Sequence, residues 1–145
     1  MSKVEEFLSA EEEQDIIDAI KNAEKNTSGE IRVHIEETSK TDAYKRAMKV
    51  FHYLKMDETK LQNAVLIYVA IADKTFAIYG DKGINEVVSE NFWNTTRDVI
   101  QQHFKSGNFK QGLVEGINEA GIQLKTYFPW LQDDTNELSD EISKL

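Results

Sequence analysis

The chain has 145 residues, 40% of them hydrophobic, and 26 acidic residues against 17 basic ones give a net charge of -9. This length and apolar content fit one folded domain, and the charge argues against nucleic acid and anionic membranes as partners. Cations or basic proteins suit such a surface better. The absence of cysteine excludes disulfide scaffolds, thiolate zinc sites and cysteine nucleophiles.

The start of the chain shows no recognisable secretory signal. The start lacks a basic segment followed by an apolar one, and the longest apolar run, residues 64–72, is far shorter than the roughly 20 residues that span a bilayer. We therefore expect a soluble cytoplasmic protein without a membrane partner. Residues 1–130 are expected to form a single domain, and residues 131–145 an acidic tail.

The first two predicted elements are a helix and a strand. Ser9 and Glu12 have the spacing of a capping box, which predicts a helix over about residues 10–25. Residues 30–36 then alternate between polar and apolar side chains, and this alternation is typical of a strand with one buried face.

A second helix and two further strands follow. Thr41 can cap a helix whose apolar positions continue to Leu54, and the apolar run at residues 63–71 predicts a strand buried on both faces. Strand, helix and strand form a βαβ unit, whose right-handed crossover makes the two strands parallel. A tight turn at Ala72–Lys74 then leads into an antiparallel strand that ends at Gly80.

Two helices complete the expected domain. Ser89 can cap the first, and the second begins at Asn108 and stops at Pro129. The resulting order is helix, strand, helix, strand, strand, helix, helix. It predicts an α/β fold, a three-layer α/β/α sandwich in which helices cover both faces of a small mixed sheet.

Three motifs in this order resemble those of the TPM domain family. They are Asn63–Leu66 at the start of the middle strand, Gly80–Gly83 after the hairpin, and Phe104–Leu113 between the last two helices. The resemblance spans about residues 10–130, with Ala64 where the family usually has glycine and the second glycine of the hairpin motif one place late. It identifies the chain as similar to the short, soluble, bacterial-type members.

The resemblance implies several properties. The family is named for a thylakoid lumen protein, a photosystem II subunit and a nematode membrane protein, and it has the three-layer sandwich fold. Some members bind divalent cations, and the plant lumenal member is an acid phosphatase. Many relatives carry a signal peptide and a membrane anchor, which are not visible here. One shared activity is not implied, because members of one fold family differ in chemistry.

A candidate metal site lies where three predicted strand ends meet. Glu30 starts the first strand, Asn63 precedes the second, and Asp81 follows the third, antiparallel strand. Carboxylate, amide and carbonyl oxygens are the ligands of Ca²⁺ and Mg²⁺, and Gly80 would permit a positive φ or a close backbone approach. We therefore predict bound Ca²⁺ or Mg²⁺. In the competing interpretation, Asp81 only caps a helical turn and Glu30 pairs with Arg32 or a lysine.

A second acidic group is expected at the opposite end of the sheet. Glu36, Glu37 and Asp73 lie beyond the carboxyl ends of the parallel strands, where ligands of α/β proteins often bind. The alternative is a hairpin tip with solvated glutamates, and we prefer it. The tail acids do not have the spacing of an EF-hand loop, and the three histidines lie too far apart in sequence for a metal motif.

These features favour a divalent-cation-binding domain that acts as an interaction or regulatory module. The first alternative is a metal-assisted acid phosphatase, which rests on the resemblance alone because no nucleophile motif such as G-x-S-x-G is present. The second alternative is a metal-free acidic adaptor for a basic protein partner.

Overall fold

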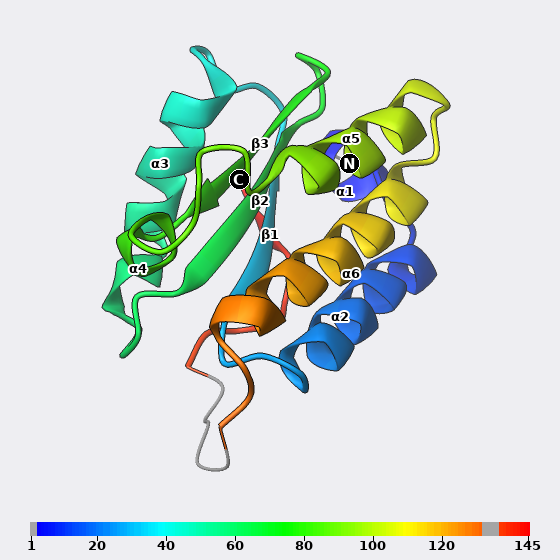
Figure 1. Cartoon of the computed structure of the whole chain (residues 1–145). Helices are drawn as coiled ribbons and strands as arrows, with labels where there is room; N and C mark the ends of the chain where they lie inside the picture. The colour runs from blue at the N-terminus through cyan, green and yellow to red at the C-terminus, as the bar shows by residue number, and fades with distance from the viewer. Residues whose placement is uncertain (1–2, 132–136) are drawn as a thin grey trace.

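The computed structural model describes residues 3–131 and 137–145. A sheet with the strand order β3-β2-β1-β4 lies between two layers of helices (Figure 1). The strands are β1 (Glu30–Glu36), β2 (Ala64–Ala70), β3 (Thr75–Gly80) and β4 (Ser143–Lys144). The helices are α1 (Lys3–Glu6), α2 (Ala10–Glu24), α3 (Ala43–Tyr53), the short 3₁₀ helix η1 (Met56–Glu58), α4 (Lys82–Asn85), α5 (Asn94–Lys105) and α6 (Phe109–Tyr127).

The three-layer α/β/α sandwich expected from the sequence is confirmed. Strands β1 and β2 are parallel and β3 runs antiparallel to β2, so the βαβ unit and the hairpin both form. Helix α3 covers one face of the sheet, and α2, α5 and α6 cover the other (Figure 1). Within the part of the chain that is described, no helix has both the length and the apolar character that crossing a membrane requires.

Every residue of β2 is buried, which explains its almost uninterrupted apolar sequence. Val65, Ile67 and Val69 pack into the core beneath α2, α5 and α6. Leu66 and Tyr68 point to the other face and pack with α3. The strand thus joins two separate apolar clusters.

Two helices begin later than the sequence predicts. The cap of α3 is Asp42, not Thr41, because the Asp42 carboxylate accepts a hydrogen bond from the backbone N–H of Lys45 at 3.1 Å. Helix α5 begins at Asn94, several residues after Ser89, and its N-cap residue Trp93 is buried. By contrast, the capping box of Ser9 at the start of α2 forms as predicted.

The end of the acidic tail belongs to the sheet, which the sequence did not indicate. Ser143 and Lys144 form β4, a short strand parallel to β1. The Lys144 ammonium lies 3.1 Å from the Glu5 carboxylate and 3.0 Å from that of Glu13, so it ties this strand to α1 and α2. Residues 132–136, which include part of the predicted tail, lie outside the described residues.

Gly83, not Gly80, is the position where two backbone segments approach closely. Gly80 has no positive φ, and a Cβ there would make an ordinary 3.4 Å contact with Trp93. A Cβ at Gly83 would instead lie 2.3 Å from the carbonyl oxygen of Gln62 and 2.5 Å from that of Leu61. Glycine at position 83 therefore lets the loop before β2 pack directly against α4.

We expect Gly83→Ala to destabilise the protein by about 1–3 kcal/mol, because backbone atoms must move to admit the methyl group. Urea denaturation measures this change. Gly80→Ala is the matched control and should have a clearly smaller effect, since its Cβ meets no atom closer than 3.4 Å. Equal losses of stability for the two variants would contradict the close approach at Gly83.

Candidate functional site

The structure brings the backbones of Glu30, Asn63 and Asp81 to one edge of the sheet. The backbone N–H of Glu30 donates to the carbonyl of Asn63 at 3.4 Å, and that of Asp81 donates to the carbonyl of Ala64 at 2.9 Å. All three side chains belong to residues that are at least nine-tenths buried. They point to different partners, however, so proximity of the strand ends does not by itself make one site.

The Glu30 side chain binds the C-terminal tail. Its Oε1 accepts hydrogen bonds from the backbone N–H groups of Glu137 and Leu138, each at 2.7 Å. Burial raises the pKa of Glu30 to about 7, in spite of these hydrogen bonds. This residue therefore anchors the tail. Among the described residues, the pairing of Glu30 with Arg32 or a lysine that the competing interpretation expects is not seen.

The Asn63 side chain joins two loops. Its amide nitrogen donates to the hydroxyl of Ser28 at 3.3 Å, and the residue is 2% exposed. Because Ser28 lies just before β1 and Asn63 just before β2, this bond fixes the relative position of the two strand starts. The side chain of Asn63 therefore stabilises the fold, whether or not an ion binds nearby.

Asp81 caps α4 with one of its two carboxylate oxygens. Oδ1 accepts a hydrogen bond from the backbone N–H of Lys82 at 2.8 Å, as the competing interpretation expects. Oδ2 is buried and has no hydrogen-bond partner among the residues that the structure describes. Burial raises the pKa of Asp81, and the nearby negative charge of Asp57 raises it further. A buried carboxylate oxygen left unpaired is unfavourable, so this oxygen requires an explanation.

Other oxygens near this edge of the sheet also resemble cation ligands. The hydroxyl of Thr59 is buried and has no hydrogen-bond partner in the described part of the chain. The carbonyls of Leu61 and Gln62 face α4 at Gly83. Among the described residues, no three side chains of His, Cys, Asp or Glu are grouped so that they could hold a metal. A cation here would depend on few carboxylates and several neutral oxygens, a ligand set that suits Ca²⁺ or Mg²⁺ better than transition metals.

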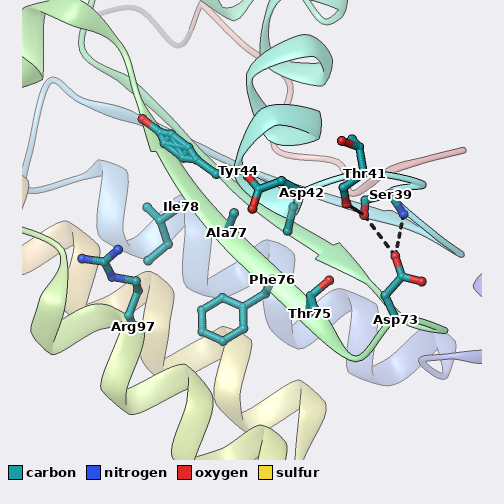
Figure 2. A pocket seen from close by; sticks show the side chains of 11 residues that line it. Ser39, Thr41, Asp42, Tyr44, Asp73, Thr75, Phe76, Ala77, Ile78 and Arg97 are labelled. Atoms are coloured by element: carbon teal, nitrogen blue, oxygen red, sulfur yellow. Dashed lines mark hydrogen bonds between the residues drawn. The ribbon is translucent and has the colours of Figure 1, made fainter.

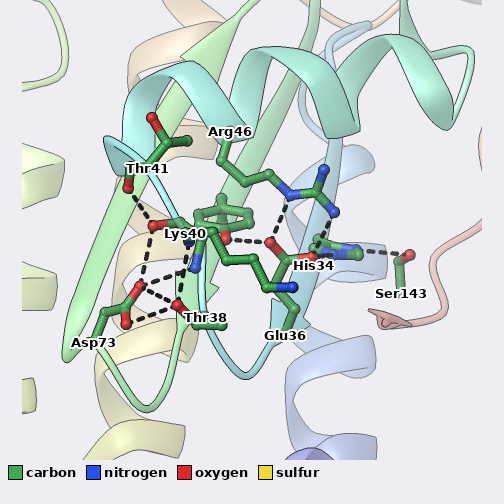
Figure 3. A network of polar contacts seen from close by, with 10 residues as sticks. His34, Glu36, Thr38, Lys40, Thr41, Arg46, Asp73 and Ser143 are labelled. Atoms are coloured by element: carbon green, nitrogen blue, oxygen red, sulfur yellow. Dashed lines mark hydrogen bonds and ion pairs between the residues drawn. The ribbon is translucent and has the colours of Figure 1, made fainter.

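At the opposite end of the sheet, Glu36 is already fully paired (Figure 3). The Arg46 guanidinium donates to both of its carboxylate oxygens, at 2.7 and 3.0 Å. The hydroxyl of Tyr68 donates to Oε2, and the ring of His34 lies 3.1 Å from Oε1. Burial opposes ionisation, but these bonds lower the pKa of Glu36 to about 2. Glu36 is thus an ion-pair partner of Arg46 and not a free ligand.

Asp73 and Glu37 do not join Glu36 in one acidic site. Asp73 accepts hydrogen bonds from the hydroxyl of Thr38 at 2.9 Å and from the backbone N–H of Ser39 at 2.8 Å, which fixes the hairpin to the loop after β1. These bonds, the one from the Ser39 backbone first, lower the pKa of Asp73. Glu37 is more than half exposed and lies 4.0 Å from Lys3. At this end of the sheet, hydrogen bonds and ion pairs already occupy the acidic side chains.

A pocket of about 530 Å³ adjoins Asp73 along the edge strand β3. Figure 2 shows Asp73 at one end of it and Arg97 of α5 at the other. The carboxylates that line the pocket, Asp73 and Asp42, are both used in hydrogen bonds that hold loops and helix ends. The sequence does not predict this pocket, because its walls come from segments that are far apart in the chain.

The sequence also does not indicate a half-buried carboxyl pair near Glu30. Glu24, at the end of α2, accepts a hydrogen bond from the backbone N–H of Ile31 at 3.0 Å and shares another with the Asp140 carboxyl. Burial, and then the bond with Asp140, raise the pKa of Glu24 to about 9. The only signal in the sequence is the position of Glu24 at the end of a helix. The sequence does not show that the C-terminal tail packs against this residue.

These carboxyls predict how stability depends on pH. The pKa values of Glu24 and Glu30 lie above the usual 4.5, so the folded protein holds their protons more tightly than the unfolded chain does. Their contribution to stability is complete below pH 4.5 and is lost as the pH rises through about 7 for Glu30 and about 9 for Glu24. We expect the melting temperature to fall over this range.

Thermal denaturation of Glu24→Gln tests the assignment, because glutamine resembles the protonated acid and has no charge to lose. The fall in melting temperature between pH 4.5 and about 9 should be smaller in this variant than in the unmodified protein. Glu11→Gln, an exposed position of the same helix, should not change it. An unchanged slope in Glu24→Gln would show that the carboxyl pair does not titrate as described.

Comparisons with known proteins agree with this fold. The NMR structure of BA42 protein from the psychrophilic bacterium Bizionia argentinensis is 69% identical, covers all of both chains and has a TM-score of 0.93. The N-terminal domain of a P. gingivalis protein is 18% identical over 84% of this chain and 79% of its own, with a TM-score of 0.68. That of cg2496 from Corynebacterium glutamicum is 10% identical over 95% and 80%, with a TM-score of 0.63.

The two distant structures share the fold alone. Among curated proteins, no sequence matches the chain. The sequence model of the TPM domain matches residues 1–123, which is most of the chain and includes the strand ends around Asp81. The motifs, the three-layer fold and this match lead to one conclusion: the chain belongs to the TPM domain family.

Proposed function

We propose that this domain binds a divalent cation, Ca²⁺ or Mg²⁺, with Asp81 as its charged ligand. The observation that carries the proposal is the second carboxylate oxygen of Asp81, which is buried and has no hydrogen-bond partner within residues 3–131 and 137–145. A bound cation would supply the missing interaction and offset the desolvation of the charge. The helix cap made by the other oxygen would remain intact.

The remaining ligands would come from the segment that precedes β2. Thr59 contributes an unpaired buried hydroxyl, and Asp57 is the carboxylate whose charge acts on Asp81. Glu30 and Asn63 support this edge of the sheet through the tail and Ser28, and we assign them no ligand role. Because so few carboxylates take part, we expect weak binding, with a dissociation constant on the order of 0.1–1 mM.

Binding at this place would fix the loop of residues 56–63 against α4. That loop already touches α4 at Gly83 and the tail through the bond from the Lys60 N–H to Glu137 at 3.1 Å. A cation would therefore stiffen three neighbouring segments at once, which suits an interaction or regulatory module. The acid phosphatase and the metal-free adaptor for a basic protein stay predictions.

Titration of the protein with Ca²⁺ and with Mg²⁺, followed by amide NMR, tests the site. We expect shifts concentrated at residues 56–63 and 80–85 at millimolar ion, together with a rise in melting temperature. Asp81→Asn should abolish both effects while leaving the fold unchanged, since asparagine also caps helices. Asp98→Asn, an exposed position of α5 with the same charge change, should retain them.

Two outcomes would contradict the proposal. One is the absence of any shift at millimolar ion in the unmodified protein. The other is cation binding that survives in Asp81→Asn but is lost in Glu30→Gln, which would move the ion to the carboxyls around the tail. The Glu30→Gln variant should bind the ion as the unmodified protein does, because Glu30 faces the tail amides.

A further inference from the structure

A pocket of about 710 Å³ opens beside the β2–β3 hairpin, on the face of the sheet that α5 and α6 cover. Its walls come from the hairpin, from the end of α5 and from the start of α6. Gly107 forms the turn between the two helices with a φ of 78°, and a Cβ at this position would meet no atom within 4 Å. The helix junction that resembles the third family motif therefore leaves open space beside the sheet.

Four phenylalanines give the pocket an apolar interior. The ring centroid of Phe104 lies 5.5 Å from that of Phe76 and 5.4 Å from that of Phe109, and the Phe7 ring lies 4.8 Å from Phe109. Phe109 remains 37% exposed, although its neighbours pack well. An apolar ligand seated here would cover aromatic surface that now faces water.

The rim of this pocket is basic, in a protein whose net charge is -9. Lys74, Arg97 and Lys105 line it together with Gln101, and none of the described residues that line it is a carboxylate. Arg97 donates to the side chain of Asn94 at 2.6 Å. Within the described part of the chain, Lys74 and Lys105 form no ion pair, so both ammonium groups are available to an anion.

We propose that this pocket binds a small amphipathic carboxylate, with its apolar body against the phenylalanines and its carboxylate at the lysines. The volume lies within the range of about 300–1,000 Å³ that is usual for small-molecule sites, and a few polar groups around an apolar interior are typical of them. Charge complementarity selects an anion. A second copy of the chain fits less well, because two copies that each carry a net charge of -9 repel one another.

Octanoate is a suitable probe, and octanamide is its neutral counterpart of the same length. Amide NMR titrations should show shifts for octanoate at Gln101, Lys105 and Gly107 and in the hairpin. Octanamide should bind about tenfold more weakly, since two exposed ion pairs are lost. Raising the salt concentration should reduce this difference, because exposed charge pairs are screened.

Variants test the basic rim and the apolar interior of the pocket separately. Lys74→Gln combined with Lys105→Gln should weaken octanoate binding about tenfold, to the level of octanamide, and leave octanamide binding unchanged. Lys45→Gln combined with Lys49→Gln removes the same charge from exposed positions of α3 and should have little effect. Gln101→Trp fills the pocket from an exposed position of α5 and should abolish binding of both molecules.

Three results would overturn the proposal. The first is the absence of shifts at the pocket with millimolar octanoate. The second is equal affinity for octanoate and octanamide, which would show that the basic rim plays no part. The third is a change of the pocket signals on dilution of the protein alone, which would identify a second copy of the chain as the occupant. None of these results bears on the cation site at Asp81, which lies at the other end of β3.

Discussion

The complete burial of β2 is the constraint on which the structure depends. A strand with all seven residues buried must pair its backbone with neighbours on both sides and cover both of its faces. Strands β1 and β3 satisfy the first requirement, and α3 together with α2, α5 and α6 satisfies the second. The proposed cation site and the phenylalanine-lined pocket both follow from this arrangement, because each lies beside one end of the buried strand.

The buried carboxylates near the two ends of β2 differ in how completely they are paired. At the carboxyl end, Glu36 meets a guanidinium, a phenol and an imidazole, and its pKa falls. At the amino end, Asp81 accepts one bond from a backbone N–H, and burial followed by the repulsion of Asp57 raises its pKa. Pairing with Arg46 leaves the Glu36 carboxylate unavailable to a cation. The less complete pairing of Asp81 is the reason why we propose the cation at this second end.

The C-terminal tail completes the sheet instead of lying loosely over it. Strand β4 pairs with β1, the hydroxyl of Ser143 lies 2.9 Å from His34, and Glu30 holds the tail through two backbone N–H groups. The Glu24 carboxyl meets Asp140 behind this contact. Burial and the bond with Asp140 raise the pKa of Glu24, so protonation of Glu24 favours this contact with the acidic segment.

The sequence by itself determined the layers, the strand pairing and the meeting of three strand ends, because these follow from periods of side-chain burial and from the handedness of a βαβ unit. It therefore placed Glu30, Asn63 and Asp81 at one edge correctly. Only the tertiary structure decided where each side chain points. The tail donates a hydrogen bond to Glu30, and the lack of a side chain at Gly83 lets the loop before β2 pack against α4. Such contacts join residues distant in the chain, and local periodicity carries no information about them.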